Sequence, residues 1–545
     1  LGAVKARGLQ WADDGALLLL VSQARSVTTA SGQQTIEFWR WVSISRKTMK
    51  ATTLLGNEGN FFIPEPGRLA STLPGDSNRV LMARWSALAR TQERDKDTRL
   101  GRTVILPLLA GTKSPTLLTV RLDSGSSGIA ASGDESTVEW IVDDAGRPAL
   151  RVDYNQRTRV TTLYGRRGDS SRLTSMATIQ EEPGGFKYGF VALADSPGKA
   201  VATTASGADK RSLVEIDLET GEPAATLFSH QAHDIDSSIY DPVTARVVSV
   251  TYTDDMPRMR HFDGAIQRIQ EQLTDAIPGA APMIETLSAD RTRMTVRVKY
   301  SDHPDQIFLF DSAARELAML APTYGGLDGE IFAAKEKYDY TASDGLAIPG
   351  YLTVPAGADK KRMPLIVLPH GGPSERDDQS FDWWAFFYAA RGYLVYQPNF
   401  RGSHGYGWKF KSAGFGEWGR KMQDDITEGV KKLIADGLVD PSRVCIVGAS
   451  YGGYAALVGA TQTPDLYACS VAVNAVTNLP DLIGASGRDN QFYKEYWESR
   501  VGNRYRDLDA MRQVSPAHNA GSARAPILLI VSRDDTVVPV TQSRY

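Results

Sequence analysis

The pentapeptide GASYG at positions 448–452 constrains this chain more than any other feature. It follows the apolar run VCIV at 444–447 and precedes GYAALV at 453–458, which is typical of a helix. A G-x-S-x-G between a strand and a helix predicts a nucleophile elbow, a sharp turn that exposes the hydroxyl of Ser450 above a parallel sheet. Glycines permit the strained turn and the close packing of helix on strand. Because the chain holds 49 glycines, the motif needs support from its surroundings.

Length and charge narrow the class of protein. A chain of 545 residues exceeds one ordinary core, so we expect two domains. Its 42% hydrophobic and 23% charged residues are typical of a soluble globular protein. A net charge of -3 argues against nucleic acid or anionic membranes as partners. No apolar run reaches the ~18 residues of a membrane span. Two cysteines, Cys445 and Cys469, are expected to be buried free thiols rather than a disulfide.

Residues 1–328 read as an all-β domain of short strands separated by turns. The related strand endings VEID at 214–217 and FLFD at 308–311 begin 94 residues apart. Two blades of about 45 residues give that spacing, which predicts a β-propeller. A sandwich array is the alternative. One helix is expected between 261 and 278, where Ile266, Ile269, Leu273 and Ile277 recur at helical spacing.

Residues 329–545 read as an α/β domain. Continuous apolar runs alternate with helical segments, at 365–368, 394–396, 444–447, 471–473 and 527–531. Strands of this kind are typical of a mostly parallel sheet that is covered on both faces.

Acyl transfer by a serine needs a base, an orienting acid and donors for the oxyanion. In an α/β-hydrolase the chain order is serine, acid, histidine. We expect the acid to be Asp534, after the run 527–531, with Asp535 as a close competitor. The oxyanion donors are expected to be the backbone N–H groups of Tyr451 and Gly372, the latter in PHGGP at 369–373. His370 precedes the serine, so we expect it to shape this loop.

Four motifs in order carry a family resemblance: HGGP at 370–373, NFRGS at 399–403, GASYGGY at 448–454 and DDTVVP at 534–539. As a set they resemble the prolyl oligopeptidase family of serine peptidases, closest to its dipeptidyl-peptidase and acylaminoacyl-peptidase branch. The resemblance implies a propeller that caps an α/β-hydrolase, with short peptides cleaved between them through an acyl-serine intermediate. It favours an exported or periplasmic location. No metal-ligand spacing or phosphate loop appears, so we expect no metal and no cofactor.

The catalytic histidine departs from the family pattern. In the family it lies well beyond the acid, whereas this chain ends eleven residues after Asp534. None of the seven histidines fits, and His518 lies between serine and acid, in the wrong order. The chain also opens at Leu1, almost inside a strand. We therefore expect truncation at both ends, with the base beyond residue 545.

Substrate contacts follow from the same resemblance. Tyr454 is expected to help shape the pocket for the side chain before the scissile bond. Tyr493 lies where the family places part of that pocket, although a helix packed on the core explains the stretch equally well. Glu181 and Glu182 resemble the paired propeller glutamates with which dipeptidyl peptidases bind a free amino terminus. A surface pair in a loop is the commoner outcome.

Two other functions stay open. An esterase or acyl-hydrolase would use the same machinery, and a propeller-based binding protein would have lost catalysis. The sequence does not separate dipeptidyl, acylaminoacyl and endo-oligopeptidase specificity, and it sets no oligomeric state. Arg401, in NFRGS, is expected to brace the loops rather than to touch substrate.

Overall fold

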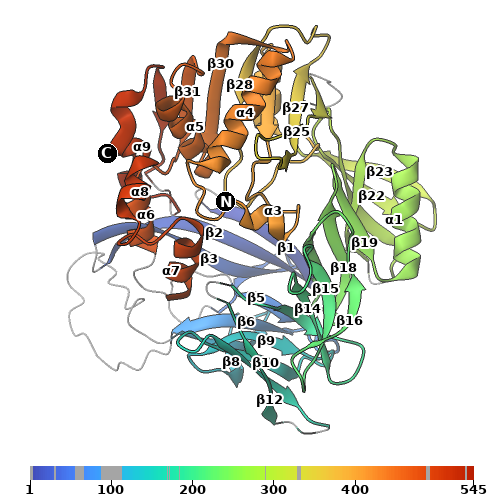
Figure 1. Cartoon of the computed structure of the whole chain (residues 1–545). Helices are drawn as coiled ribbons and strands as arrows, with labels where there is room; N and C mark the ends of the chain where they lie inside the picture. Colours follow the sequence, from blue (N-terminus) through green and yellow to red (C-terminus); the bar gives the residue numbers. More distant parts are fainter. Residues whose placement is uncertain are drawn as a thin grey trace, which may run out of the picture.

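The computed structural model describes residues 4–29, 32–55, 67–87, 113–168, 170, 172–182, 185–288, 290–327, 333–486, 491–533, 535 and 537–544. Within these residues, six antiparallel sheets precede residue 323, and one seven-stranded sheet follows it. Figure 1 shows the six sheets arranged as blades below and beside the layered C-terminal part. The predicted β-propeller and α/β-hydrolase are both confirmed.

Each blade is a meander whose strands pair in chain order. Blades 1 to 6 comprise β1–β4, β5–β8, β9–β12, β13–β16, β17–β19 and β20–β23. The strands are Lys5–Asp13 (β1), Ala16–Thr29 (β2), Gly32–Ser45 (β3), Ala51–Thr53 (β4), Arg68–Ser71 (β5), Arg79–Ala87 (β6), Lys113–Arg121 (β7), Ser127–Ser132 (β8), Thr137–Val142 (β9), Pro148–Asn155 (β10), Val160–Arg166 (β11), Leu173–Gln180 (β12), Gly189–Leu193 (β13), Lys199–Thr204 (β14), Ser212–Asp217 (β15), Pro223–Phe228 (β16), Ile235–Asp241 (β17), Arg246–Thr253 (β18), Pro257–His261 (β19), Ala281–Leu287 (β20), Arg293–Lys299 (β21), Gln306–Asp311 (β22) and Glu316–Pro322 (β23).

The repeat predicted from the sequence has a structural basis. VEID ends β15 and FLFD ends β22, and each is the third strand of its blade, two blades apart. The expected helix is α1 (Gly264–Ala276), which begins after Asp263, whose carboxylate accepts the N–H groups of Ala265 and Ile266. Ile266 and Leu273 pack with the blade 6 core, so the apolar stripe is a packing face.

The seven-stranded sheet has the order β24-β27-β29-β28-β30-β31-β32, in which the pairs from β29 to β32 are parallel and the pairs β24–β27 and β27–β29 are antiparallel. The strands are Ala333–Lys337 (β24), Gly350–Pro355 (β27), Met363–Val367 (β28), Leu394–Pro398 (β29), Val439–Ala449 (β30), Cys469–Val473 (β31) and Ile527–Ile530 (β32); the small hairpin Tyr340–Thr341 (β25) and Ala347–Ile348 (β26) lies apart from it. The expected boundary between 328 and 329 falls outside the described residues and stays a prediction.

Helices cover both faces of this sheet (Figure 1). They are Trp383–Ala389 (α2), Trp408–Ser412 (α3), Lys421–Ala435 (α4), Tyr451–Gln462 (α5), Leu479–Ser486 (α6), Gln491–Arg500 (α7), Leu508–Gln513 (α8) and Pro516–Asn519 (α9). Successive residues of β28 alternate between the two cores. Leu365 and Val367 pack in one core with α4 and α5, and Ile366 packs in the other with α2. Burial on both faces is why the strands are continuously apolar.

The two cysteines correct one expectation. Cys445 of β30 and Cys469 of β31 are register partners on neighbouring parallel strands, with α-carbons 4.7 Å apart, and they form a disulfide. The expectation of free thiols was therefore wrong. Strand register brings the two sulfurs within the geometry of a disulfide, and a pair 24 residues apart in sequence does not reveal that register.

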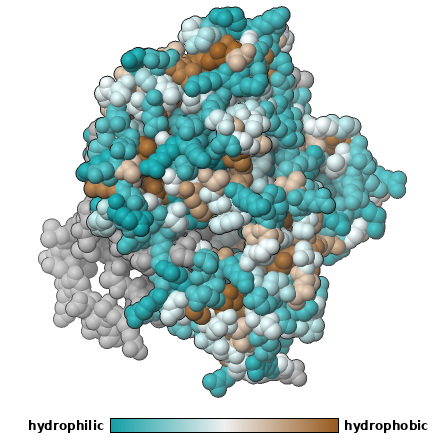
Figure 2. Space-filling view, in the orientation of Figure 1, coloured by the Kyte–Doolittle hydropathy of each residue, from teal (hydrophilic) through white to brown (hydrophobic). Residues whose placement is uncertain are grey.

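The face of the molecule seen in Figure 2 is mostly hydrophilic. Figure 2 shows apolar side chains on the visible face in small separate patches. The four residues of β32, at the edge of the sheet, are 38–55% exposed. None of the helices in the described ranges has the length and apolarity that a membrane crossing requires.

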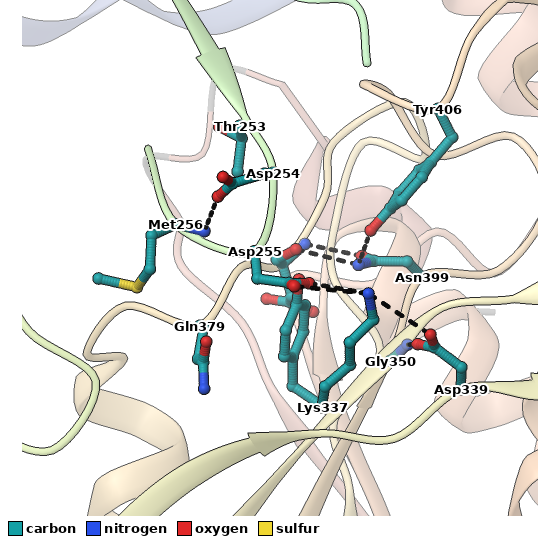
Figure 3. Close-up of polar contacts among 12 residues, drawn as sticks. Thr253, Asp254, Asp255, Met256, Lys337, Asp339, Gly350, Gln379, Asn399 and Tyr406 are labelled. Atoms are coloured by element: carbon teal, nitrogen blue, oxygen red, sulfur yellow. Dashed lines mark hydrogen bonds and ion pairs between the residues drawn. The ribbon is translucent and has the colours of Figure 1, made fainter. Parts of the chain in front are cut away.

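Polar contacts join blade 5 to the first strands of the hydrolase sheet. Asp255, in the turn after β18, accepts a hydrogen bond from the hydroxyl of Tyr351 at 3.0 Å. The ammonium of Lys337 lies 3.2 Å from the Asp255 carboxylate and 3.5 Å from that of Asp339 (Figure 3). The propeller is thus fastened to β24 and β27 by charged and hydrogen-bonded pairs.

A second set of contacts fastens the loops that surround the site. The guanidinium of Arg376 donates to the carbonyl oxygens of Thr253 at 3.0 Å and Asp254 at 2.9 Å. Asp234, just before β17, accepts the N–H of Gly407 at 3.0 Å, directly before α3. Blade 5 therefore holds one side of the hydrolase domain in place.

Candidate active site

Ser450 occupies the turn between β30 and α5 that the motif predicts. Its backbone has φ 56° and ψ −119°, a conformation that a residue other than glycine adopts only under strain. Two hydrogen bonds hold the turn: the Ser450 N–H donates to Val473 of β31 at 2.9 Å, and the Ser450 carbonyl accepts the N–H of Tyr454 at 3.0 Å. The strained residue is therefore fixed by the sheet on one side and by the helix on the other.

The glycines of the motif are required by close approaches. A β-carbon on Gly448 would lie 2.4 Å from the backbone of Gly452. A β-carbon on Gly452 would lie 2.2 Å from the carbonyl oxygen of Pro369. The first contact sets α5 against its own strand. The second sets the elbow against residues 369–373, here called the glycine loop, which follows β28.

Backbone donors converge beside the serine. Tyr451 is the first residue of α5, so its N–H lies at a helix N-terminus, where N–H groups lack intrahelical partners and the dipole favours negative charge. In the glycine loop, a β-carbon on Gly371 would lie 3.8 Å from the Ser450 β-carbon. Gly372 has φ 111°, and its N–H has no hydrogen-bond partner among the described residues. The structure thus brings Ser450, Tyr451 and the glycine loop together at the carboxyl ends of β30 and β28.

His370 lies within the glycine loop and against a neighbouring loop. Its ring stacks on Phe400, with centroids 4.4 Å apart. Nδ1 is 2.8 Å from the carbonyl oxygen of Gly371, and Nε2 is 2.9 Å from the hydroxyl oxygen of Ser403. Burial lowers the pKa of His370 to about 4, so the ring is neutral near pH 7. These contacts agree with the expected role in shaping the loop.

Arg401 braces residues 399–403, here called the arginine loop. Its side chain is 5% exposed and donates to both carboxylate oxygens of Asp425, a fully buried residue of α4, at 2.9 and 2.7 Å. It also donates to Asp344, in the turn of the β25–β26 hairpin, at 2.8 Å. The backbone N–H of Arg401 adds a further bond to Asp425 at 2.8 Å. Bidentate charged hydrogen bonds of this kind fix a loop strongly.

The acid candidates lie after β32. Asp534 falls outside the described residues. Asp535 is described, and its Oδ1 accepts the N–H groups of Val537 and Val538, each at 2.8 Å. That pattern is a local turn, in which an aspartate side chain binds the backbone that follows it. The choice between Asp534 and Asp535 stays a prediction.

Tyr454 does not border a pocket in this structure. Its side chain is fully buried under the elbow, in contact with Trp418 and Tyr451, and its hydroxyl donates to the carbonyl of Val514 at 2.9 Å. It therefore supports the elbow from the core and contributes no surface to a pocket. Tyr493 falls within α7, but its side chain lies outside the described part of the chain.

Glu181 and Glu182 differ in environment. Glu181, directly after β12, is only 4% exposed, and it accepts hydrogen bonds from the Thr161 hydroxyl and the Lys187 N–H, both at 2.6 Å. Burial raises the pKa of its carboxyl. Glu182 is exposed. The interpretation as a surface pair is therefore wrong for Glu181 and right for Glu182.

A link between the two domains went unpredicted. Arg159, in the turn between β10 and β11, lies 3.1 Å from Glu495 of α7. The same Arg159 accepts the Glu181 N–H on its carbonyl at 2.8 Å. Burial raises the pKa of nearby Tyr154, and the charges of Glu495 and Glu181 add to that shift. This wall of blade 3 therefore faces the hydrolase domain. The ion pair joins residues 336 apart, a separation at which no sequence periodicity signals a contact.

No group of three or more His, Cys, Asp or Glu side chains suited to a metal occurs among the residues that the structure describes. What the site offers chemically is a strained serine and backbone donors, which suit addition to a carbonyl group.

The C-terminal part of the chain matches a known protein family. Residues 379–544 match the family described as "Prolyl oligopeptidase family". The chain is 31% identical over 352 residues to dipeptidyl aminopeptidase BIII of Pseudoxanthomonas mexicana, a match that covers 63% of this chain and 50% of that protein. It is 29% identical over 182 residues to an acylamino-acid-releasing enzyme of Arabidopsis thaliana, covering 33% of this chain and 24% of that protein. The chain thus spans about half the length of the curated relatives that it matches over the longest stretches.

Solved structures share the whole fold. A puromycin-hydrolyzing peptidase of Mycobacterium tuberculosis aligns with a TM-score of 0.70 at 16% identity, covering 99% of this chain and 88% of that one. An acylaminoacyl peptidase of Pyrococcus horikoshii aligns with a TM-score of 0.64 at 16% identity over the same shares. At this identity the likeness concerns the arrangement of propeller and hydrolase.

Acid should weaken the folded state through His370. The unfolded chain binds a proton at the ordinary histidine pKa of 6.5, whereas the folded chain binds it only near pH 4. Because the unfolded state holds more protons between these values, this residue should lower the free energy of unfolding by about 3 kcal/mol as pH falls through that window. His370→Asn does not titrate. We expect the stability difference between wild type and this variant, from urea unfolding, to shrink by that amount from pH 6.5 to pH 4; a constant difference would contradict this.

Proposed function

We propose that this chain, whose residues 379–544 belong to the prolyl oligopeptidase family, is part of a serine peptidase that cleaves short peptides through an acyl-serine intermediate. One observation carries the proposal: the strained Ser450 lies beside both a helix N-terminus and the glycine loop. Backbone N–H groups fixed around a nucleophile are what a tetrahedral oxyanion requires. The names of the relatives, a dipeptidyl aminopeptidase and acylamino-acid-releasing enzymes, support a peptide substrate.

In the proposed reaction, the Ser450 hydroxyl oxygen attacks the scissile carbonyl carbon while a histidine base takes its proton. The carbonyl oxygen becomes an oxyanion, which accepts hydrogen bonds from the N–H groups of Tyr451 and Gly372. The protonated histidine then gives its proton to the leaving amine, and the C–N bond breaks. Water then attacks the carbonyl carbon of the acyl-serine while the histidine takes a proton from it, and the histidine returns that proton to the Ser450 oxygen as the acyl C–O bond breaks.

We assign the acid that orients the histidine to Asp534 rather than Asp535. One oxygen of Asp535 already accepts two backbone N–H groups of its own turn. An acid of the triad has to hold the ring of the base, and a carboxylate committed to its turn is less free to do so. Asp534 directly precedes Asp535 in the sequence.

We also propose that Glu181 and Glu182 receive the free amino terminus of the substrate. They lie on the wall of blade 3 that faces α7, next to the Arg159–Glu495 pair. The two oxygens of Glu181 each accept one hydrogen bond, and a carboxylate has capacity for about four. An ammonium ion beside Glu181 would offset the free-energy cost of burying the charged form of the Glu181 carboxylate.

Ser450→Ala in the full-length protein should abolish hydrolysis of peptide amides, with kcat reduced by about a million-fold or to background. Ser442→Ala is the matched control, because Ser442 lies on the same strand and is exposed. Activity is measured on a panel of peptide amides and the corresponding esters. Cleavage of esters alone would make the protein an esterase. A folded wild type that cleaves neither would favour a binding protein.

Glu181→Gln, Glu182→Gln and the double variant should lose preference for free amino termini. We expect the ratio of kcat/KM for a free peptide to that for its acetylated form to fall by roughly tenfold to a hundredfold, since a charged hydrogen bond contributes about 1.5–3 kcal/mol. The larger loss should come from the buried Glu181. Glu222→Gln removes an exposed propeller glutamate and should leave the ratio unchanged. Unchanged selectivity in the double variant would reject the proposed role.

A further inference from the structure

We propose that Lys411 of α3 and Arg500, the last residue of α7, form a subsite that binds a carboxylate group of the peptide substrate. The inference rests on the proposed function and deepens it, because it assigns a charge preference to the substrate. The carboxylate belongs to an acidic side chain or to the carboxyl terminus of a short peptide, and the two sources are separable by experiment.

The two cations line one pocket beside the candidate active site. Its wall includes Pro373, the last residue of the glycine loop, and Gly402 of the arginine loop. Trp418 also lines the pocket, and its ring contacts that of Tyr451, the first residue of α5, with centroids 4.6 Å apart. A group that binds in this pocket therefore lies against the loops that surround Ser450.

Both helices lie on the side of the hydrolase domain that is next to the propeller (Figure 1). α3 contacts blade 4, where the carboxylate of Asp209 accepts the backbone N–H of Lys409 at 2.8 Å. α7 contacts blade 3 through the ion pair of Arg159 and Glu495. The proposed subsite is thus at the border between the two domains.

The ammonium group of Lys411 has no counter-ion among the residues that the structure describes. Burial lowers the pKa of Lys411, and the positive charges of Arg500 and Arg211 lower it further. The carboxylates of Asp234 and Glu375 act in the opposite direction without reversing the shift. An anion placed beside this half-buried ammonium group would stabilise its charged form.

The two nearby carboxylates are not paired with Lys411. Asp234 is engaged by backbone groups, because its two oxygens accept the N–H of Arg211 at 2.7 Å and the N–H of Gly407 at 3.0 Å. Glu375 is exposed, so water screens its charge, and it forms no ion pair with Lys411. The positive charge at this border is therefore left for a ligand to neutralise.

Arg500 is held in place while one edge of its guanidinium group stays without a partner. The group lies over the rings of Phe415 and Tyr496, 4.7 and 3.7 Å from their centroids. Nη1 donates to the Tyr496 carbonyl at 3.0 Å and to the Ser499 hydroxyl at 2.8 Å. Nε is buried and has no hydrogen-bond partner in the described parts of the chain. Nε and Nη2 make up the edge that binds a carboxylate through two parallel hydrogen bonds.

The chemistry of peptides identifies the anion. Near neutral pH, an unmodified peptide carries negative charge only on aspartate, on glutamate and at its carboxyl terminus. Partly buried charge without a counter-ion destabilises a folded protein, and a ligand that supplies the missing partner removes that cost. Lys411 and Arg500 therefore favour an acidic peptide over its neutral counterpart.

A matched series of substrates tests this preference in the full-length protein. One glutamate is moved along a short peptide, each peptide is compared with its glutamine counterpart, and each pair is made with a free carboxyl terminus and with a terminal amide. We expect kcat/KM to be about tenfold to a hundredfold higher with a carboxylate at one position, and this advantage to be lost in Lys411→Gln, in Arg500→Gln and in the double variant. Lys409→Gln, at an exposed lysine of the same helix, should keep it.

The source of the carboxylate follows from which peptides are favoured. An advantage that follows the glutamate assigns the subsite to a side chain, and one that follows the free terminus assigns it to the carboxyl end. No advantage for any carboxylate in the wild type, or an advantage that remains in the double variant, would overturn the proposal.

Thermal unfolding provides a control for the fold. Because Lys411→Gln relieves repulsion and burial of charge, its unfolding temperature should equal or exceed that of the wild type. A marked decrease would mean that Lys411 has a partner within the fold, which would also overturn the proposal.

Direct binding separates the subsite from the proposed function. Isothermal titration calorimetry with the Ser450→Ala protein should show that the favoured acidic peptide binds more tightly than its neutral counterpart, and Lys411→Gln with Arg500→Gln in that background should remove the difference. Carboxylate-dependent binding by a protein whose wild type cleaves no peptide would reject the proposed function alone. Cleavage of peptides without any dependence on a carboxylate would reject the subsite alone.

Discussion

The C-terminal domain depends on one close approach, between the first turn of α5 and the loop after β28. The Gly452 α-carbon lies so near the Pro369 carbonyl that a single added carbon would clash at 2.2 Å. This contact places a helix N-terminus, a strained serine and a glycine loop within reach of one carbonyl group. Because protein interiors are close-packed, the neighbouring backbone leaves Ser450 few other conformations and so maintains its strain. The site is therefore a consequence of how tightly the elbow packs.

A series of contacts holds the loops around the elbow in place. The arginine loop is fixed by Arg401 to the buried Asp425 of α4, and the glycine loop is fixed to the arginine loop through His370. The propeller holds the same region from outside, where Arg376 donates to two carbonyls of blade 5. On the opposite side, Arg159 and Glu495 join blade 3 to α7. Preorganised donors of this kind contribute most when nothing must move as charge develops.

Local patterns in the sequence were enough to predict the elbow, the alternation of strands and helices, and the blade repeat, since each extends over a few neighbouring residues. What they missed depends on pairing between distant segments. The disulfide follows from the register of β30 and β31, which no single strand specifies. The burial of Glu181 follows from Thr161 on the adjacent strand. The inward direction of Tyr454 follows from its place on a helix buried all round, where hydrophobic periodicity gives no direction.

Labelling of the full-length protein with a fluorophosphonate, followed by mapping of the adduct by mass spectrometry, tests most directly whether Ser450 is an activated nucleophile. Such probes place a phosphoryl oxygen where the oxyanion would form, so they report on the serine and on its backbone donors together. We predict an adduct on Ser450 that disappears in Ser450→Ala. A folded protein that takes no label would contradict a catalytic role for this site.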